Sequence, residues 1–326
     1  MEPAVQTISL ITPSVTGGSF SSFYADLSQI ASIVNRRFYR QGINWAVAGI
    51  KVLTTGTGTI QVEKLPNTWV MSNSWEKSMR TWMKMNMEAL AETESVRPKF
   101  LDFKIYADDG HHKAGYGANL LPYNAQLPPV PFTPGEWKAS MISYPDNTTT
   151  TGLTREAEFI AVGSSYNGAG ASGEQAVSMI EGYAASRGLP NVLDPNTPGD
   201  AADAAGPFPE NWMAAIFNEG TDQIEEVLED LTNDNNIAPY PFENDGVHVD
   251  TMYPGGANQG EGLQLHDLEF ITSTTIGGTT RLKGGNFPCG LMKFTWVPNE
   301  TTNLRIQIDL VPGNHRGYLC EPMTEM

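Results

Sequence analysis

The chain of 326 residues has few of the groups that carry metal, redox or disulfide chemistry. It holds five histidines and two cysteines, Cys289 and Cys320. The cysteines lack the paired spacing of a zinc or iron–sulfur site, and without a recognisable secretion signal we expect both to be free thiols. No apolar run approaches the roughly 18 residues of a membrane span. The sequence therefore predicts no metal, no cofactor and no membrane partner.

Charged residues are also scarce, at 17% of the chain, and their balance is strongly acidic, with a net charge of −17. The excess of acidic residues is unevenly distributed along the chain. Residues 1–113 hold 12 Lys and Arg against 10 Asp and Glu, whereas residues 114–326 hold 8 against 27. This asymmetry predicts two surfaces with different surroundings. A conventional nucleic-acid-binding domain has a basic balance overall, which this chain lacks.

The 32 glycines and 22 prolines are frequent, and they separate short apolar segments. Alternating apolar and polar residues, clearest from Leu304 to Leu310, are typical of strands with one buried face. The pattern predicts an all-β fold with long loops. Eight segments are expected to be strands: 43–53, 59–65, 99–107, 136–144, 157–163, 263–275, 289–297 and 303–311.

Three segments have helical spacing, namely 74–92, 172–188 and 221–231. The first carries Trp and Met side chains three and four residues apart, which predicts packing against a core or an interface rather than a cofactor site. The third has many carboxylates, typical of a solvated helix face and less often of a cation site.

The clearest motif of an enzyme is GAGASG at 168–173, a G-x-G-x-x-G between an expected strand and an expected helix. In dinucleotide-binding folds, such glycines let backbone N–H groups approach a pyrophosphate. Four residues separate the strand from the first glycine, and Glu174 places a negative charge beside the phosphate position. No nucleophile motif is present either. We therefore predict a flexible loop, no catalytic residue and no enzyme, with an NAD(P)-dependent oxidoreductase as a lesser alternative.

One short segment, NRRFYRQG at 35–42, concentrates positive charge in this acidic chain. Arginine binds phosphate with two parallel hydrogen bonds, and aromatic rings stack on bases without regard to sequence. The segment is a candidate single-strand contact, with a subunit interface or structural ion pairing as the alternatives. The predicted nucleic-acid contacts are Arg36, Arg37, Phe38, Tyr39 and Arg40.

Three phrases of the chain together resemble a known family. They are VNRRFYRQGINWAVAGIKVL, GTIQVEKLPNTWVMSNSWEKSMRTWMKMN and RPKFLDFKIYADDGHH, within residues 34–112. They resemble the capsid proteins of circular, Rep-encoding single-stranded DNA viruses. Such proteins commonly begin with a long basic arm, whereas this chain has no basic residue before Arg36.

The resemblance implies an eight-stranded jelly-roll β-sandwich with long loops and a few short inserted helices. It implies an N-terminal arm at 1–34, a shell domain at 35–312 with insertions at 108–135 and 164–262, and a C-terminal tail at 313–326. The function would be icosahedral self-assembly, in 60 copies or a multiple, around single-stranded DNA. The virion would be assembled inside a host cell, and the host receptor is not predicted. Aromatic and Met side chains are enriched at interface cores, so the expected subunit contacts are Trp69, Trp75, Met79, Trp82 and Met83.

A different class of protein also fits the β-rich pattern. A β-sandwich that binds glycans would use its long acidic loops as the site and would remain a monomer or a small oligomer. Self-association therefore discriminates between the two readings.

Overall fold

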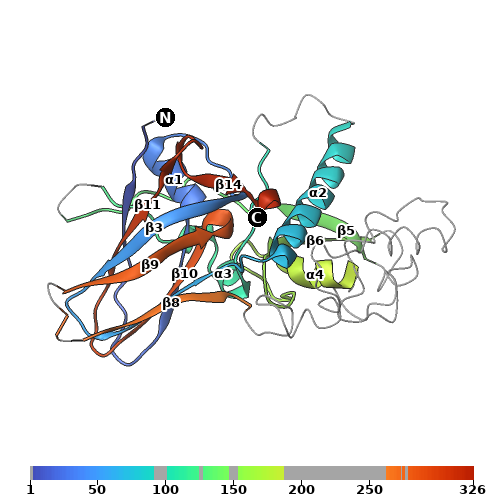
Figure 1. Ribbon diagram of the computed structural model, residues 1–326. Coiled ribbons are helices and arrows are strands. Elements are labelled where there is room, and N and C mark those ends of the chain that lie inside the picture. The colour runs from blue at the N-terminus through green and yellow to red at the C-terminus, as the bar shows by residue number, and fades with distance from the viewer. Residues whose placement is uncertain are drawn as a thin grey trace, which may run out of the picture. The chain divides into compact units, whose positions relative to one another are not determined.

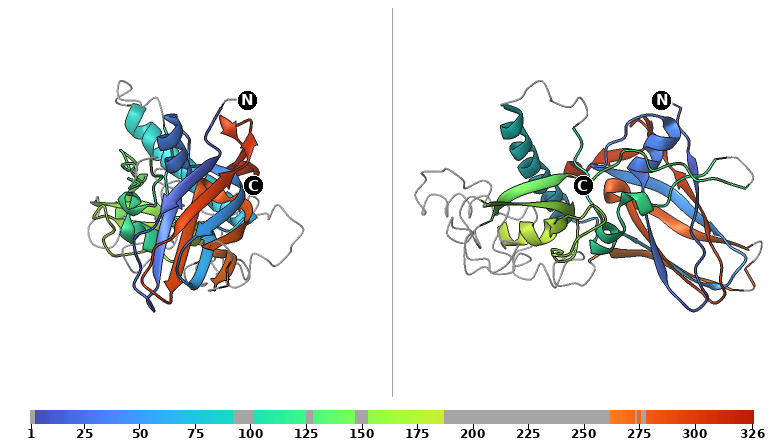
Figure 2. Two further views of the ribbon diagram at one scale, coloured as in Figure 1. Left: turned by 90° about the vertical axis from the view of Figure 1, so that its left-hand side faces the viewer. Right: turned by 180° about the vertical axis from the view of Figure 1, so that it is seen from behind.

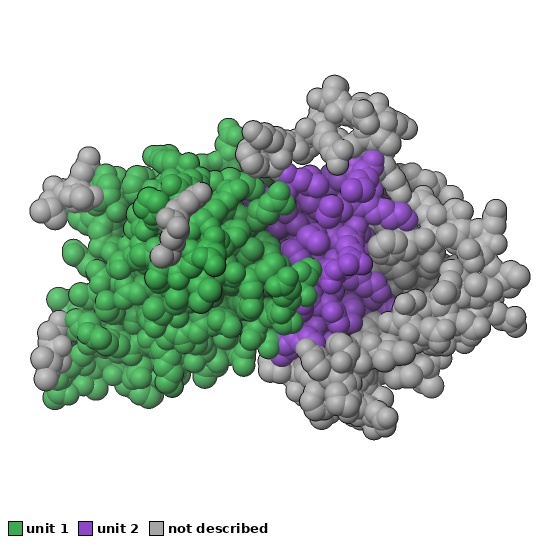
Figure 3. All heavy atoms as spheres, turned by 45° about the horizontal axis from the view of Figure 1, so that its top comes forward, with its two compact units in different colours: residues 1–67, 114–138, 264–326 green, residues 68–113, 139–263 purple. Residues whose placement is uncertain are grey.

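The structure is a computed structural model that describes residues 3–91, 101–124, 128–146, 153–186, 262–272, 274–275 and 278–326. The chain forms two compact units (Figure 3). Unit 1 comprises residues 1–67, 114–138 and 264–326, and unit 2 comprises residues 68–113 and 139–263. No helix among the described residues is long and apolar enough to cross a bilayer.

The first sheet of unit 1 is built around β3 (Ile43–Leu53), the longest strand described. Its burial alternates along most of its length, because side chains of a strand point to opposite faces in turn. It pairs antiparallel with β9 and with β11, and β11 in turn pairs with β1. β14 pairs antiparallel with the first residues of β3. The partners are β1 (Thr7–Ile11), β9 (Thr279–Phe287), β11 (Arg305–Leu310) and β14 (Cys320–Pro322).

The second sheet of unit 1 has four antiparallel strands in the order β2-β10-β4-β8. Two of these strands, β8 and β10, are labelled in Figure 1. The strands are β2 (Ser21–Asp26), β4 (Gly58–Lys64), β8 (Gln264–Ile271) and β10 (Leu291–Pro298).

The two sheets lie face to face around one apolar core (Figure 2). Trp45 and Ile306 enter it from the first sheet, and Ile60, Phe294 and Trp296 enter it from the second. All five are completely buried. Burying a large apolar side chain stabilises the folded state by about 1.5–3 kcal/mol, so these inward faces fix how the sheets pack.

The register of the strands defines two ends of unit 1. At the loop end, the connections β1–β2, β3–β4, β8–β9 and β10–β11 meet, and main-chain hydrogen bonds join them: Gly18 to Pro298, Val15 to Thr302, and Thr54 to Gly278. The opposite, helix end carries α1 (Leu27–Asn35), the turn at Pro288–Gly290, and the hairpin of β12 (Pro312–Gly313) and β13 (Gly317–Tyr318).

Unit 2 combines helices with a three-stranded sheet of order β5-β6-β7, in which β6 and β7 are parallel. Its aromatic core stacks Trp75 and Trp82 on Phe103, and Phe103 on Phe159, with ring centroids 4.9–6.1 Å apart. Its elements are α2 (Trp69–Ala91), α3 (Asp109–Ala114), β5 (Met141–Asp146), β6 (Leu153–Ile160), β7 (Gln175–Ser178) and α4 (Met179–Ser186).

The predicted β-rich character is confirmed, but the expected strands divide between the two units. Segments 43–53, 59–65, 263–275, 289–297 and 303–311 correspond to β3, β4, β8, β10 and β11. Segments 136–144 and 157–163 overlap β5 and β6 of unit 2. The described part of 99–107 contains only an isolated bridge at Tyr106, so that strand was wrong. The strands β1, β2 and β9 were not predicted from the sequence.

Of the three predicted helices, one is confirmed, one is confirmed in part and one lies outside the described residues. Segment 74–92 is confirmed as part of α2. Only the second half of 172–188 is helical, because Gln175–Ser178 joins the sheet as β7 before α4 begins. The segment 221–231 lies outside the described residues.

The predicted division of the chain needs correction. Residues 1–34 are not a separate arm, because they supply β1, β2 and most of α1 to unit 1. Residues 313–326 are not a tail, since they form part of the hairpin and β14. Unit 2 interrupts the chain between β4 and β8. Most of the expected insertion at 164–262 lies outside the described residues, and residues 114–135 of the one expected at 108–135 belong to unit 1.

Candidate nucleic-acid interface

The basic segment begins where α1 ends. Asp26 caps the start of this helix, and its carboxylate accepts hydrogen bonds from the backbone N–H groups of Ser28 at 2.8 Å and Gln29 at 3.3 Å. At the other end, Arg36 adopts a left-handed backbone with φ of 53°, which stops the helix. The arginines therefore follow a helix end that is fixed at both termini.

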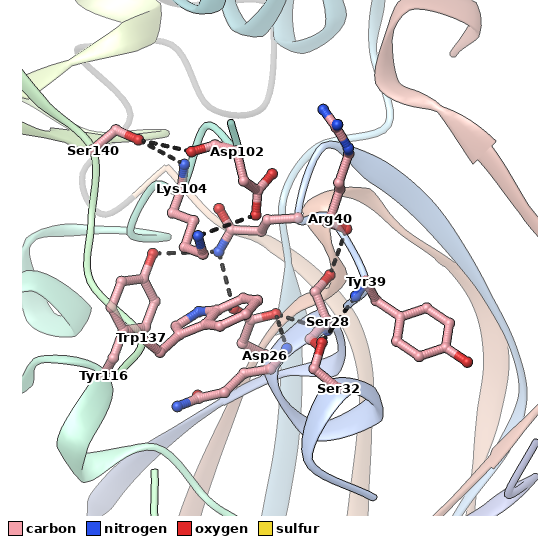
Figure 4. A network of polar contacts seen from close by, with 12 residues as sticks. Asp26, Ser28, Ser32, Tyr39, Arg40, Asp102, Lys104, Tyr116, Trp137 and Ser140 are labelled. Carbon is pink, nitrogen blue, oxygen red and sulfur yellow. Dashed lines mark hydrogen bonds and ion pairs between the residues drawn. The ribbon is translucent and has the colours of Figure 1, made fainter. Parts of the chain in front are cut away.

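Two serines of α1 hold the segment that carries the arginines. Ser32 Oγ accepts a hydrogen bond from the backbone N–H of Tyr39 at 3.0 Å. Ser28 Oγ donates to the carbonyl of Arg40 at 3.0 Å (Figure 4). It also accepts a hydrogen bond from the Trp45 indole at 3.1 Å. These contacts pin the main chain while the arginine side chains stay outside, so the segment is pre-organised.

Asp26 also receives two side-chain donors, Gln41 at 3.1 Å and the Trp137 indole at 3.0 Å (Figure 4). Its carboxylate is completely buried. Burial raises the pKa of Asp26 to about 6, and the hydrogen bonds hold this increase back because they favour the charged form. Through Gln41, the same carboxylate fixes the C-terminal side of the arginine segment.

Tyr39 does not stack on bases as predicted. Its side chain is fully buried, and its ring packs against those of Trp45, His315 and Tyr318 at 5.5–6.4 Å between centroids. Its hydroxyl donates to the carbonyl of Arg316 at 2.9 Å. Tyr39 therefore anchors the segment to the core, and only the half-buried Phe38 retains a ring near the surface.

The three predicted arginines differ in exposure. Arg36 and Arg40 are exposed, and neither has an ion pair with any residue that the structure describes. In Figure 4, the Arg40 side chain points away from Ser28 and Asp26. Arg37 is half-buried and donates to the carbonyl of Pro3 at 3.1 Å. Arg36 and Arg40 are therefore the better candidates for binding an anion.

A fourth arginine, missed from the sequence, joins this surface. Arg316 lies in the turn of the β12–β13 hairpin, and its Nη1 donates to the carbonyl of Phe38. Its side chain is exposed, and its backbone is left-handed with φ of 50°, which costs energy for any residue with a side chain. Burial and the charge of Arg316 lower the pKa of the neighbouring His315. We call Arg36, Arg37, Arg40 and Arg316 the arginine surface.

Comparison with protein-family models, with curated proteins and with solved structures finds no match. The chemistry of the arginine surface therefore rests on its geometry. Guanidinium groups on a pinned main chain suit phosphate oxygens, because the planar fork forms two parallel hydrogen bonds. With Tyr39 buried, the surface presents guanidinium groups and, besides the half-buried Phe38, little aromatic area.

The five predicted subunit contacts all lie on α2 of unit 2. Trp69, Trp75 and Trp82 are buried, and the last two form the aromatic core of unit 2. They stabilise this unit and are not free to cover a neighbouring subunit. Met79 and Met83, on the same helix, are half-buried.

The glycine motif at 168–173 does not have dinucleotide-binding geometry. The chain continues from it into the strand β7, so no helix N-terminus faces the glycines. A Cβ on Gly168 would lie 2.4 Å from the Tyr166 hydroxyl, and one on Gly170 would lie 2.4 Å from His112 Cε1. Gly168 and Gly170 thus allow the loop to approach the rings of Tyr166 and His112.

The two adjacent histidines lie on α3 and are both completely buried. His111 Nδ1 accepts a hydrogen bond from the backbone N–H of Ala107, and His112 Nε2 lies 3.0 Å from Glu158 Oε2. Ser172 Oγ donates to the same carboxylate oxygen at 2.8 Å. Within the described ranges, no three His, Cys, Asp or Glu side chains are placed to hold a metal ion. Cys289 and Cys320 are free thiols.

Proposed function

We propose that this chain is a capsid protein that assembles into a closed shell and contacts a nucleic acid through the arginine surface. The proposal includes the finer fold class, a viral jelly roll, and the family suggested by the resemblance above.

The observation that carries the proposal is the nested pairing of the eight long strands of unit 1. In chain order, the first pairs with the eighth (β1 with β11), the second with the seventh (β2 with β10), the third with the sixth (β3 with β9) and the fourth with the fifth (β4 with β8). A jelly roll is this nested hairpin rolled into two facing sheets. The pairs β3–β11 and β4–β10 join the hairpins within each sheet, as such a roll requires.

The arginine surface supports a polyanionic partner. The whole chain has a net charge of −17, so its long-range field repels a nucleic acid. Binding therefore needs local phosphate contacts, and the four arginines of the arginine surface, which come from two distant parts of the chain, are the candidates for them. Because Tyr39 is buried and Phe38 is half-buried, the contact is mainly with the backbone of the nucleic acid and is independent of base sequence.

The test is to purify the full chain and examine it by negative-stain electron microscopy and light scattering. We expect closed, uniform particles, and an absorbance ratio at 260 and 280 nm that shows enclosed nucleic acid. The triple variant Arg36→Ala, Arg40→Ala and Arg316→Ala should form particles that contain less nucleic acid. The matched control is Arg305→Ala, an exposed arginine at the loop end of unit 1.

Two outcomes contradict the proposal in different ways. A monomer or dimer at all salt concentrations and pH values, with or without calcium, excludes the shell. If the triple variant and the Arg305→Ala control form particles with the same nucleic-acid content, the shell is supported but the arginine surface is excluded as the nucleic-acid contact.

A further inference from the structure

The second sheet of unit 1 has an outward face that is open at the loop end. On β10, Phe294 and Trp296 enter the core, so Thr295 and Val297 point outward. On β4, Ile60 and Val62 enter the core, so Thr59 and Gln61 point outward. The same alternation sends Leu268 and Phe270 of β8 outward, because Ile271 faces the core.

The register aligns these outward residues in two rows across the four strands. One row runs Ser22, Thr295, Gln61, Leu268. The other contains Val297, Thr59 and Phe270, and extending the β2–β10 register by one residue adds Phe20 opposite Val297. We call these eight residues the open face.

Two phenylalanines stand at opposite edges of the open face. Phe20 exposes 74% of its surface and Phe270 exposes 68%, the two highest values among the exposed large apolar side chains. Leu268 and Val297 are exposed to 37% and 39%. Burying a Phe side chain normally stabilises the folded state by about 1.5–3 kcal/mol, so two largely exposed rings on one face point to a binding surface.

The groups between the rings are uncharged and polar. Ser22 Oγ and Thr295 Oγ1 lie 3.0 Å apart and share one hydrogen bond, which leaves further donor and acceptor capacity on both hydroxyls. Gln61 Nε2 donates to Glu63 at 2.7 Å, and its amide retains a second N–H and a carbonyl oxygen. The face therefore alternates apolar surface with hydrogen-bonding groups.

The charges that border the open face pair with one another. The next outward row contains Lys293, which is 5% exposed and whose Nζ lies 3.5 Å from Glu63 Oε2. Lys293 and Glu63 neutralise one another, and none of the eight residues of the open face is charged, so these residues offer no cation to a phosphate, a sulfate or an anionic lipid. An uncharged partner fits it best.

The arrangement is also the reverse of a protein–protein interface. Such interfaces have an apolar, aromatic centre and a polar rim. Here the aromatic rings stand on the outer strands, and three of the four residues of the central strands in the two rows carry hydroxyl or amide groups. A saccharide has the complementary chemistry, since the C–H faces of its rings cover aromatic side chains while its hydroxyls bond to Ser, Thr and Gln.

We propose that the open face binds an uncharged oligosaccharide, with Phe20 and Phe270 each covering one sugar ring. Three strand spacings separate the outer strands, which places the two side chains roughly 14 Å apart. The ligand must therefore be a chain of several sugars rather than a monosaccharide. This site is distinct from the arginine surface and does not depend on shell assembly.

The test uses the full chain and three neutral probes, cellohexaose, maltohexaose and chitohexaose. We expect saturation-transfer NMR to detect binding of at least one probe. The double variant Phe20→Ala and Phe270→Ala should raise the Kd for that probe at least about tenfold, which corresponds to about 1.4 kcal/mol. Phe270→Tyr, which keeps the ring, should bind as the wild type does.

Two controls separate this site from the rest of the molecule. Leu319→Ala removes an apolar side chain that is 50% exposed and lies outside the open face, and it should leave the Kd unchanged. The triple arginine variant should also bind the probe normally, so failure of the capsid proposal does not affect this result.

Three outcomes overturn the proposal. The first is that none of the three probes binds. The second is that a probe binds with the same Kd to the wild type and to the double phenylalanine variant. The third is that no probe binds while sedimentation shows a dimer that only the double variant abolishes, which would assign the open face to a second copy of the chain.

Discussion

The hydroxyl of Tyr39 donates a hydrogen bond to the main-chain carbonyl of Arg316 at 2.9 Å, between residues separated by 277 positions in the sequence. In return, Arg316 Nη1 donates to the carbonyl of Phe38. The two contacts tie the arginine segment to the C-terminal hairpin. The tie explains why Arg316 belongs to the same surface although nothing in the sequence links the two segments.

Replacing Tyr39 should separate its packing role from its hydrogen bond. Tyr39→Ala leaves a cavity among buried rings and should lower the free energy of unfolding by about 3–5 kcal/mol. Tyr39→Phe keeps the ring and loses one hydrogen bond, at a cost of about 1 kcal/mol. Urea unfolding of both variants measures the difference. Equal and small losses would show that the ring is not packed as described.

The arginine surface should determine how binding depends on salt. Each phosphate contact that is lost makes the slope of log K against log[salt] less negative by about 0.7 for a single strand. The triple variant Arg36→Ala, Arg40→Ala and Arg316→Ala should therefore reduce the slope by about 2. Fluorescence anisotropy with a labelled oligothymidylate measures it. An unchanged slope, or an equal change in Arg305→Ala, would contradict these contacts.

Asp26 should make unit 1 more stable in mild acid. Burial raises its pKa from 3.8 to about 6 in the folded chain, so the folded state binds this proton more tightly than the unfolded state. Its contribution is fully present below the unfolded pKa and is lost as the pH rises through about 6. Between pH 4.5 and 7.5, the loss amounts to about 2 kcal/mol.

The measurement compares urea unfolding at these two pH values in the wild type and in Asp26→Asn. The side-chain amide of asparagine would place an N–H donor where Gln41 and Trp137 also donate. The variant should therefore be less stable at both pH values, and its stability should lack the pH dependence that Asp26 contributes. Asp267 and Asp309, whose pKa values are lowered by their Lys partners and hydrogen bonds, titrate in both proteins and cancel. Identical pH dependence in the two proteins would refute the assignment.

The glycine loop should tolerate no side chain against His112. A Cβ at position 170 would lie 2.4 Å from the imidazole, so Gly170→Ala should destabilise unit 2 by about 1–3 kcal/mol. Gly117→Ala is the matched control, because a Cβ there has nothing within 4 Å. Differential scanning calorimetry of both variants tests this. Equal melting temperatures would show that the loop does not pack on His112.

The regular strands could be predicted from the sequence because their burial follows local alternation. β3 was predicted with the observed bounds, and β11 with a clear alternation of Ile306, Ile308 and Leu310. β9 escaped notice because Gly284 and Gly285 interrupt its pattern. α1 escaped notice too, although Asp26 is a good N-cap, since nine residues give a weak periodic signal.

The site was predictable only in part. The cluster of arginines at 36–40 is visible as composition, but the burial of Tyr39 depends on contacts with Trp45 and Tyr318 that a linear pattern does not contain. The tryptophans of α2 show the same difficulty. Their spacing predicts a buried stripe, and only the position of Phe103 shows that the stripe faces the core of unit 2.

The pairing of β1 with β11 has a consequence for biosynthesis. The strand at Thr7–Ile11 leaves the ribosome about 300 residues before its partner at Arg305–Leu310. Until then, the first sheet lacks the strand that joins β1 to β3, and contacts this distant in sequence form slowly. Unit 1 therefore cannot complete its first sheet before residues 305–310 have emerged, and until then its unpaired strand edges and apolar side chains are exposed to association with other chains.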